Sequence, residues 1–443
     1  MFFERPDSGE IAILVQLELD GEQEPDPREF EELALSAGAC PVEMVSGGLK
    51  HVNPRFFVGT GKLEEIQHMI SLHQAEVVLF DHALSPSQER NLERDLKCRV
   101  LDRTGLILDI FAQRARSYEG KLQVELAQMQ HSLTRLVRGW THLDRQKGGI
   151  GVRGVGETQL EIDQRLVRGR IKAINKSLEK VRKQRDQGRR ARKRAEIPTV
   201  SLVGYTNAGK SSLFNRMSES DIYVADQLFA TLDSTLRKIQ LPDFGPAILA
   251  DTVGFIRNLP HQLVDAFRAT LEETVEANLL LHVIDCHNEE RQLLKDQVDE
   301  VLHEIGAHEI PTLLVFNKID LIGGKPQVDR DEHGTPWRVW VSASTGAGMT
   351  ELRQAIGELL GEDLIEPTLP LEPRQGKLRA RLYGQGVVKA ESVDARGTIK
   401  LSLRLPRENF IRLLKEEGMD PAPYLPAPSP GSDTTAQEAP ALP

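Results

Sequence analysis

The first part of the chain, to about residue 110, alternates between short apolar runs and stretches whose apolar residues recur every third or fourth position. The strand-like runs are 11–19, 77–81 and 99–102, and the helix-like stretches are 27–37, 62–73 and 86–97. Strands that alternate with helices form mainly parallel sheets, because each helix returns the chain to the edge where the next strand begins. We therefore predict a small α/β domain over residues 1–111.

Two longer segments carry a seam of apolar residues at helical spacing. The first seam consists of Leu122, Leu126, Met129, Leu133, Leu136, Trp140 and Leu143, and the second of Leu160, Val167, Ile171, Ile174, Leu178 and Val181. Each segment of roughly 24 residues would form a helix about 36 Å long. The sequence between them, GGIGVRGVGE at 148–157 with Arg153 near its centre, has too many glycines for a helix. We predict an antiparallel helical hairpin over 112–196, whose glycine-rich tip either reaches a partner or simply turns the chain.

The rest of the chain, residues 197–443, divides into three parts by its pattern of apolar and polar residues. Residues 197–364 contain buried-strand runs, at 198–203, 248–251, 311–316 and 337–341, that each end in a polar motif. Short strands over 374–405 and a helix over 407–417 predict a small α+β domain at 365–420, and the Pro-, Ala-, Ser- and Thr-rich residues 421–443 are predicted to be disordered. The fold class is therefore α/β, with a central nucleotide-binding domain between smaller appendages.

The strongest chemical signal follows the strand at 198–203. Residues Gly204, Tyr205, Thr206, Asn207, Ala208, Gly209, Lys210 and Ser211 form a complete G-x-x-x-x-G-K-[ST] phosphate loop. Its backbone N–H groups can turn toward phosphates, Lys210 can reach the β and γ phosphates, and Ser211 can offer its hydroxyl to Mg²⁺. We expect a nucleotide site here.

Two further motifs indicate which nucleotide is bound. Asp251, Thr252, Val253 and Gly254 form D-x-x-G, whose carboxylate can hold a Mg²⁺-bound water and whose glycine N–H can meet a γ phosphate. The residues Asn317, Lys318, Ile319 and Asp320 form N-K-x-D, and Ser342, Ala343 and Ser344 follow the next strand. The Asp320 carboxylate can accept two hydrogen bonds from guanine, whereas adenine has no matching pair of donors, so we predict GTP and GDP as ligands.

A second magnesium-binding hydroxyl is expected between these motifs. We assign it to Thr231, in the segment Phe229, Ala230, Thr231, Leu232 and Asp233, although Thr206, Thr235 and Thr252 compete for the role. Lys210, Thr231 and Gly254 are the expected catalytic positions. Phe255 stands where many GTPases carry a glutamine that orients water, so slow intrinsic turnover is expected, with the missing polar group supplied from elsewhere.

Charge is distributed unevenly along the 443 residues. The formal net charge is -10, yet residues 112–196 hold 22 Lys and Arg against 9 Asp and Glu, and the rest of the chain holds 34 against 57. The densest stretch, KVRKQRDQGRRARKR at 180–194, fits either a solvated helix face or an RNA-binding surface. Three separated cysteines suggest thiols without disulfides, and no run approaches a membrane span or a signal peptide. We expect a cytoplasmic monomer and leave peripheral membrane association open.

Several of these segments together resemble one family. GGLKHVNPRFFVGTGKLEEI, GVRGVGETQLEID, GYTNAGKSSLFN, FATLD, DTVGFIRNLP and NKID are similar to the HflX family of ribosome-associated GTPases, within the Obg-HflX group, over about 11–414. The resemblance implies binding of the GTP-loaded protein to the large ribosomal subunit and its rRNA, with the hairpin tip directed to the peptidyl transferase region. It also implies a role in splitting or rescuing stalled ribosomes under stress, and stimulation of the GTPase by the ribosome.

The function that we expect is a GTP-dependent clamp. GTP and Mg²⁺ would order the loops around Thr231 and Gly254, and the ordered state would bind ribosomal RNA through the basic hairpin. An RNA-remodelling ATPase with a second nucleotide site at residues 59–62 is an alternative, although a helix-starting turn also explains that glycine-rich sequence. A scaffold with an inactive phosphate loop is a third interpretation, which the complete set of motif residues disfavours.

Overall fold

The computed structural model confirms the predicted α/β class. The structure describes residues 9–20, 25–139, 159–194, 197–218, 228–229, 231–232, 235–242, 244–257, 271, 273–361, 364–371, 375–384, 387–393, 398–403, 405–417 and 419–425. The glycine-rich tip with Arg153, the seam residues Trp140 and Leu143, Ala230 and Asp233, and the tail from 426 lie outside these ranges. Contacts group the chain into two compact units, one comprising 1–240 and 246–352 and the other 241–245 and 353–443.

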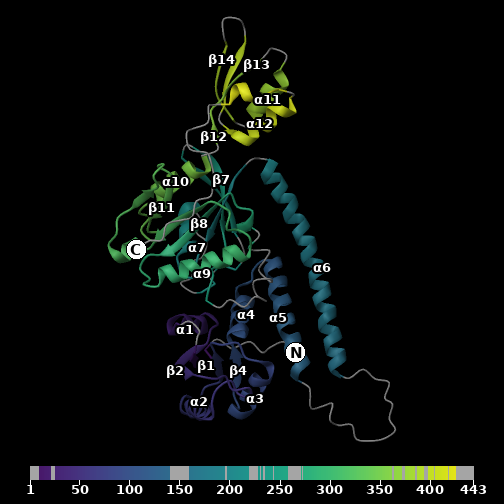
Figure 1. The fold of residues 1–443 in the computed structure, drawn as a ribbon. Helices are drawn as coiled ribbons and strands as arrows, with labels where there is room; N and C mark the ends of the chain where they lie inside the picture. Colours follow the sequence, from purple (N-terminus) through teal and green to yellow (C-terminus); the bar gives the residue numbers. More distant parts are fainter. Residues whose placement is uncertain are drawn as a thin grey trace. The chain divides into compact units, whose positions relative to one another are not determined.

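The N-terminal domain contains a parallel sheet, as predicted, with four strands. Its strands, in the order β2-β1-β3-β4, are β1 (Ile11–Leu19), β2 (Cys40–Leu49), β3 (Val77–Phe80) and β4 (Arg99–Asp102). Its helices are α1 (Pro27–Ser36), α2 (Thr60–His73), α3 (Pro86–Leu96) and α4 (Arg103–Arg114). In Figure 1, α1 and α4 cover one face of the sheet and α2 and α3 the other.

Local sequence explains where these helices begin. The Asp26 carboxylate accepts hydrogen bonds from the backbone at the start of α1, and Ser85 forms a capping box with Gln88 at the start of α3. Asp102 caps α4 by accepting the Gly105 N–H at 2.8 Å. Side chains along each strand alternate between the two faces, so that Ala12 and Leu14 join one apolar cluster while Ile13 joins the other.

Two elements of this domain were not predicted. β2 is a partly exposed edge strand that contains a proline and two glycines, so its sequence lacks the apolar alternation of an ordinary strand. The α4 helix is buried over most of its length, and its nearly continuous apolar run hides the helical period. It also extends past residue 111, where the sequence pattern suggested a domain boundary.

The long hairpin consists of α5 (Tyr118–Gly139) and α6 (Gln159–Arg194). Leu122, Ile174 and Leu178 are buried between the helices. Ion pairs join Arg185 to Glu119 at 2.8 Å and Arg170 to Glu125 at 2.6 Å, so the two helices run antiparallel. The α6 helix has 36 residues, more than predicted, because the Lys-, Arg- and Gln-rich stretch after Val181 continues the helix.

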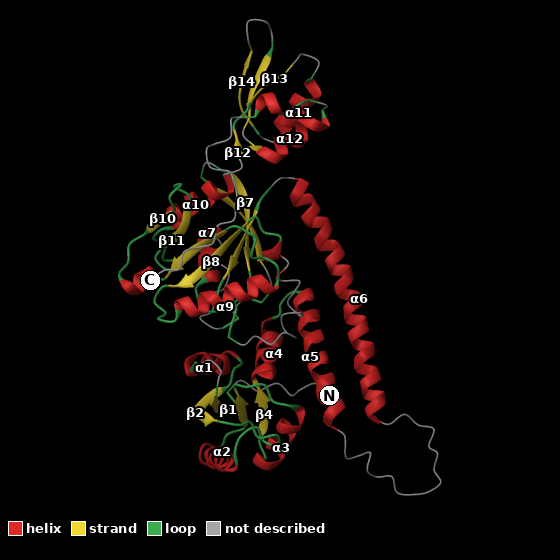
Figure 2. Cartoon of the chain, in the orientation of Figure 1, coloured by secondary structure: helices red, strands yellow, loops and turns green. Residues whose placement is uncertain are grey.

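The central domain is built on a seven-stranded sheet in the order β10-β11-β9-β8-β5-β7-β6. Figure 2 shows strands of this sheet in yellow with helices beside them. The strands are β5 (Thr199–Val203), β6 (Thr235–Leu241), β7 (Gly245–Asp251), β8 (Leu279–Asp285), β9 (Thr312–Asn317), β10 (Gln327–Arg330) and β11 (Pro336–Trp340). The described helices are α7 (Lys210–Ser218), α9 (Arg291–Glu304), α10 (Met349–Gly361) and the 3₁₀ helix η2 (Ile319–Ile322). Strands β7, β5, β8, β9 and β11 are parallel, and the carboxyl ends of all but β8 carry the predicted motifs.

The C-terminal part forms its own small α+β unit. A three-stranded antiparallel sheet contains β13 (Thr368–Leu371), β15 (Ile399–Leu403) and β14 (Val388–Val393), while β12 (Leu364–Ile365) pairs with β16 (Leu405–Pro406). Its described α-helices are α11 (Gly376–Gly384) and α12 (Arg407–Glu416), and the 3₁₀ helix η3 (Ala422–Tyr424) follows within residues predicted to be disordered. The strand prediction for 374–405 is wrong at α11, because leucines there at helical spacing, Leu378 and Leu382, are buried in the core.

Candidate functional site

The predicted phosphate loop connects β5 to α7 through a tight turn. Gly204 and Gly209 adopt left-handed backbone conformations, with φ of 141° and 90°. A Cβ at Gly204 would lie 2.3 Å from the Val283 carbonyl oxygen, and a Cβ at Gly209 would lie 2.2 Å from Nδ2 of Asn317. A Cβ would force the backbone to shift at Gly204 and the Asn317 side chain to shift at Gly209, so glycine fits both positions best. The result is a compact loop at the amino end of a helix, which is a suitable place for a phosphate group.

Lys210 is the first residue of α7, and its side chain is buried. Its ammonium group donates a hydrogen bond to the Tyr205 carbonyl oxygen at 2.6 Å. Burial lowers the pKa of Lys210 to about 8, while the charge of Asp251 acts in the opposite direction. A buried ammonium group whose pKa is lowered by desolvation would be stabilised by a nearby anion such as a phosphate.

Ser211, Thr231 and Asp251 come together beside the loop. The Ser211 and Thr231 hydroxyl oxygens are 2.7 Å apart, and each lies 2.9 Å from Oδ2 of Asp251. Burial raises the pKa of Asp251, and its Oδ1 is buried with no hydrogen-bond partner in the described part of the chain. Two hydroxyls and a carboxylate with a spare oxygen are hard ligands of the kind that suits Mg²⁺, directly or through water.

The D-x-x-G segment lies against the phosphate loop. A Cβ at Gly254 would be 2.7 Å from Cγ2 of Thr206 and 2.9 Å from the Lys210 ammonium nitrogen, so a larger residue would clash with the loop. Thr252 donates its hydroxyl to the Leu202 carbonyl oxygen at 2.5 Å, and this bond holds Thr252 in the strand layer. The side chain of Phe255 is buried in an apolar cluster with Val203, Leu280 and other core residues.

The predicted guanine-binding residues lie on two neighbouring loops. Asn317 is buried; its amide donates to the Ala208 carbonyl oxygen at 2.9 Å and accepts the Ala343 N–H at 3.0 Å. This side chain therefore ties the phosphate loop to the 342–344 segment. The side chain of Lys318 pairs with Asp285 at 2.8 Å.

Asp320 is exposed, in contrast to Asn317. The Ser342 hydroxyl donates to Oδ1 of Asp320 at 2.6 Å, and this bond is the main reason that the pKa of Asp320 is lowered. The Ser344 hydroxyl lies 3.0 Å from that of Ser342. An ionised carboxylate held at the edge of the sheet, with an oxygen left to accept further donors, suits the N1–H and amino edge of guanine.

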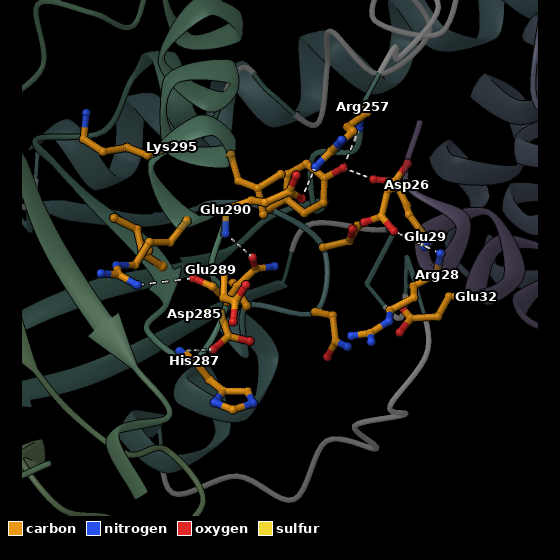
Figure 3. Close-up of a pocket in the computed structure, with 18 of the residues that line it drawn as sticks. Asp26, Arg28, Glu29, Glu32, Arg257, Asp285, His287, Glu289, Glu290 and Lys295 are labelled. Atoms are coloured by element: carbon orange, nitrogen blue, oxygen red, sulfur yellow. Dashed lines mark hydrogen bonds and ion pairs between the residues drawn. The ribbon is translucent and has the colours of Figure 1, made fainter. Parts of the chain in front are cut away.

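A cavity of about 750 Å³ is lined in part by residues 205–208 of the phosphate loop, and no sequence motif had indicated it. Figure 3 shows carboxylates and guanidinium groups interleaved around it, including Asp26, Glu29, Arg257 and Glu290. The Tyr205 hydroxyl donates to the Glu29 carboxylate and accepts the Arg257 N–H at 2.7 Å. The sequence signal for Tyr205 is an aromatic residue at an unspecified position of the G-x-x-x-x-G-K-[ST] motif.

The glycine-rich turn of the N-terminal domain, at residues 59–62, begins α2. Gly59 is its N-cap, without a side-chain cap. The Lys62 ammonium group donates to the Ser46 carbonyl oxygen at 2.8 Å and pairs with Glu65 at 2.8 Å. These contacts are those of a helix start, and none of them favours a second nucleotide site. Among the described helices, none is long and apolar enough to cross a bilayer.

Family models match three successive segments of the chain. Residues 24–112 match a model described as GTP-binding GTPase N-terminal, 114–192 match GTP-binding GTPase Middle Region, and 199–318 match 50S ribosome-binding GTPase. Together they cover most of the N-terminal domain, nearly all of the hairpin and the greater part of the central domain.

Relatives extend this similarity to nearly the full length. A protein of Escherichia coli (strain K12) named GTPase HflX is 57% identical over 417 residues, which cover 94% of this chain and 98% of the relative. A protein of the same name from Caldanaerobacter subterraneus subsp. tengcongensis is 47% identical over 392 residues, covering 88% and 89%. The crystal structure of a GTP-binding protein from the archaeon Sulfolobus solfataricus, in complex with GDP, is 26% identical with a TM-score of 0.43, covering 78% of this chain and 98% of that one.

Proposed function

The chain belongs to the HflX family of GTPases, and from this premise we propose that its GTP-bound form, with Mg²⁺, binds the large ribosomal subunit and acts in splitting or rescuing stalled ribosomes. Hydrolysis would return the protein to a weakly binding GDP form. The observation that carries the nucleotide part is the convergence of Ser211, Thr231 and Asp251 beside a buried Lys210. A nucleotide with its Mg²⁺ would complete the charges and bonds that these groups leave unbalanced.

The roles of the site residues follow from their positions. The loop from Gly204 to Ser211 would hold the phosphates, with Lys210 as the cation that reaches them. Ser211 and Thr231 would bind Mg²⁺, and Asp251 would hold a water of its shell. When bound, Mg²⁺ would neutralise charge that develops on the phosphate oxygens. Gly254 packs closely against Lys210. Its N–H would donate a hydrogen bond to the γ phosphate when GTP is bound.

Guanine recognition would use the other side of the site. Asp320 would accept the N1–H and amino donors, while Asn317 would keep the 342–344 segment in register with the phosphate loop. The buried ring of Phe255 brings no polar group to an attacking water, which supports slow turnover by the isolated protein. We infer that the ribosome accelerates hydrolysis by completing the site.

The hairpin would supply the RNA-binding surface. On α6 the side chains of Lys172, Lys176, Lys180, Arg182 and Lys183 are exposed. Their charge lies within the most basic segment of an otherwise acidic chain. The description of the matching family, 50S ribosome-binding GTPase, supports a ribosomal partner, and exposed basic side chains on a long helix suit the phosphates of rRNA.

We expect nucleotide-dependent and strongly salt-dependent binding to large subunits. In sedimentation with separated subunits, the protein should pellet with the large subunit in a non-hydrolysable GTP analogue and remain in the supernatant in GDP. With about six phosphate contacts, affinity should fall on the order of 10³-fold between about 50 and 200 mM salt.

Charge-reversal substitutions test whether the exposed lysines of α6 make the contacts with RNA. Replacing Lys176 and Lys180 by glutamate should weaken binding and reduce the salt dependence, because contacts to RNA phosphates are lost. Replacing the exposed Lys377 by glutamate, in the C-terminal unit, should change neither. Equal retention in GDP and in the analogue would contradict the proposed switch.

Splitting, if it uses binding energy, should not require hydrolysis. In a single-turnover assay with intact ribosomes, light scattering should fall at a similar rate with GTP and with the non-hydrolysable analogue. Release of the protein from the large subunit afterwards should be slowed by the analogue by at least roughly tenfold, since only hydrolysis removes the γ phosphate. An absolute requirement for hydrolysis in the first round would rule this mechanism out.

A further inference from the structure

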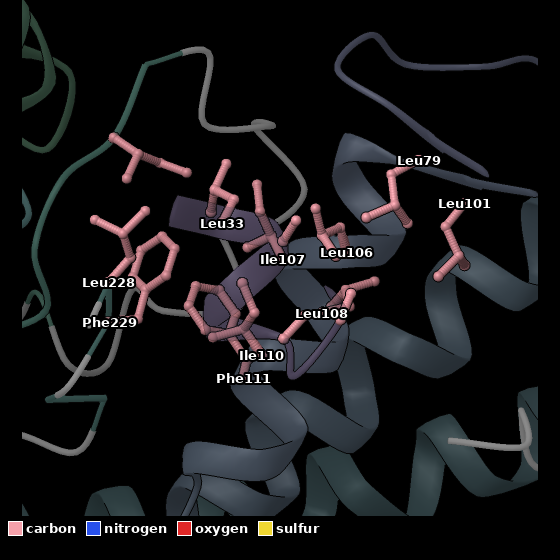
Figure 4. Packing of buried hydrophobic residues seen from close by; sticks show 14 of the residues in the cluster. Leu33, Leu79, Leu101, Leu106, Ile107, Leu108, Ile110, Phe111, Leu228 and Phe229 are labelled. Atoms are coloured by element: carbon pink, nitrogen blue, oxygen red, sulfur yellow. The ribbon is translucent and has the colours of Figure 1, made fainter. Parts of the chain in front are cut away.

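The apolar core of the N-terminal domain continues onto the central domain. One cluster contains Leu33, Ile107 and Phe111 of α1 and α4, all fully buried, together with Leu228, Phe229 and Leu232. Figure 4 shows Phe229 and Leu228 beside Phe111 and Ile110. The three residues from the central domain belong to the segment that carries Thr231, so the two domains share this core at one specific loop.

The contacts across this junction are specific in geometry. The rings of Phe111 and Phe229 pack edge to face, with centroids 4.7 Å apart and an interplanar angle of 79°. The Leu228 N–H donates to the Ser36 hydroxyl at 3.1 Å, and Ser36 is buried. The loop is therefore fastened to α4 by an aromatic pair and to α1 by a hydrogen bond.

The backbone at Phe229 supplies an independent observation. Its φ of 55° is in the left-handed region, which bulky residues rarely adopt. Such a conformation persists only where the surroundings hold it in place. Here the surroundings include Phe111 and other apolar residues of the N-terminal domain, and Phe229 is 2% exposed.

Thr231 faces the other way within the same segment. Its hydroxyl lies 2.9 Å from Asp251 and 2.7 Å from Ser211, while Leu232 beside it is buried in the shared cluster. The described residues of the loop thus make two different sets of contacts. Leu228, Phe229 and Leu232 anchor it on the N-terminal domain, and Thr231 reaches the candidate metal site.

We propose that Phe111 is a positioning residue for Mg²⁺-dependent GTP hydrolysis: through Phe229 it holds the Thr231 hydroxyl at the metal site. The inference rests on the proposed role of Thr231 as a magnesium ligand. It gives the N-terminal domain a direct part in completing the nucleotide site, at a distance from the phosphates themselves.

The test measures how much Mg²⁺ the reaction needs. For Phe111→Ala and for Phe229→Ala, the Mg²⁺ concentration that gives half-maximal single-turnover GTP hydrolysis should rise roughly tenfold, which corresponds to the loss of a strong aromatic pair. Binding of a fluorescent GDP in EDTA should stay unchanged, because it uses no metal. The double variant should need no more Mg²⁺ than either single variant, since both remove the same contact.

Matched variants separate positioning from a general loss of stability. Leu92→Ala truncates a fully buried residue on the opposite face of the same sheet, and it should leave the Mg²⁺ requirement unchanged. Phe111→Leu keeps most of the apolar volume and should restore most of the wild-type response. Phe229→Ala changes the loop side of the contact, so the test remains valid if Phe111→Ala does not fold.

Thr231→Ala distinguishes this inference from the proposed function. If Thr231→Ala raises the Mg²⁺ requirement but neither phenylalanine variant does, the positioning role is overturned and the magnesium site stands. If Thr231→Ala itself leaves the requirement unchanged, the assignment of Thr231 to Mg²⁺ fails and the positioning role fails with it. A similar rise in Leu92→Ala would also overturn the inference, because the effect would then reflect stability alone.

Discussion

Lys210→Ala should reduce GTP hydrolysis by on the order of 10²–10³ and abolish nucleotide-dependent retention on the large subunit. Lys210 is the only buried cation placed at the start of α7, in the described residues, where the phosphates are expected. Without it, the phosphate loop keeps its backbone donors but loses the charge that opposes the phosphate oxygens. Single-turnover hydrolysis and sedimentation with large subunits would measure the two effects.

The same variant should be at least as stable as the wild type in the absence of nucleotide. Burial lowers the pKa of Lys210 to about 8, from 10.5, so a charged ammonium group is less favourable in the folded chain than in the unfolded one. The cost is fully present below pH 8, fades as pH rises toward 10.5, and disappears when the amine is removed. Thermal unfolding at pH 7 should therefore show no loss of stability, and a marked loss would attribute the kinetic defect to misfolding.

Asp320→Asn should exchange the preferred base. The carboxylate accepts both donors of guanine, whereas an asparagine amide offers one acceptor and one donor. That pair matches the N1–H and C2 carbonyl of xanthine. GTP binding should fall by at least roughly 10³-fold, and XTP should support hydrolysis and subunit binding in its place. Equilibrium titration with fluorescent GDP and XDP would test the exchange.

The control for this variant is Asp329→Asn. Asp329 also has a lowered pKa, but it accepts from Trp340 and Arg338 in the β10–β11 hairpin and belongs to none of the predicted guanine-binding segments. It should leave the choice of base unchanged. Unaltered preference for GTP in Asp320→Asn would show that another group recognises the base.

The sequence was sufficient for the elements whose local signals agree with their environment. The strands at Ile11–Leu19 and Arg99–Asp102 have the predicted bounds, because each is a β-rich apolar run between clear breaks. The hairpin was also predicted, since its seam follows the helical period. By contrast β2 and α11 were missed or misassigned, because neighbours in space, rather than local composition, determine their state.

The candidate site also contains features that the sequence predicted and features that it did not. Motif order placed Asp251 and Asn317 at the ends of two strands and Ser211 in the motif that follows a third strand. In the fold, Ser211 contacts Asp251, and Asn317 contacts the phosphate loop at Ala208. Their roles in binding remain proposals. No sequence pattern could reveal that Phe229 packs on Phe111, because the two residues are distant along the chain and unrelated by any period. The aromatic residue in the phosphate loop draws attention to Tyr205, but nothing in the sequence indicates Glu29 as its partner.

The short connection between the hairpin and the central sheet has a mechanical consequence. Only residues 195–198 separate the end of α6 from β5, the strand that leads into the phosphate loop. The five Cα-to-Cα steps from Arg194 to Thr199 can span at most roughly 18 Å even when fully extended. A displacement of α6 by more than this length would have to move β5 as well. Movement of the hairpin would then be transmitted to the strand that leads into the phosphate loop.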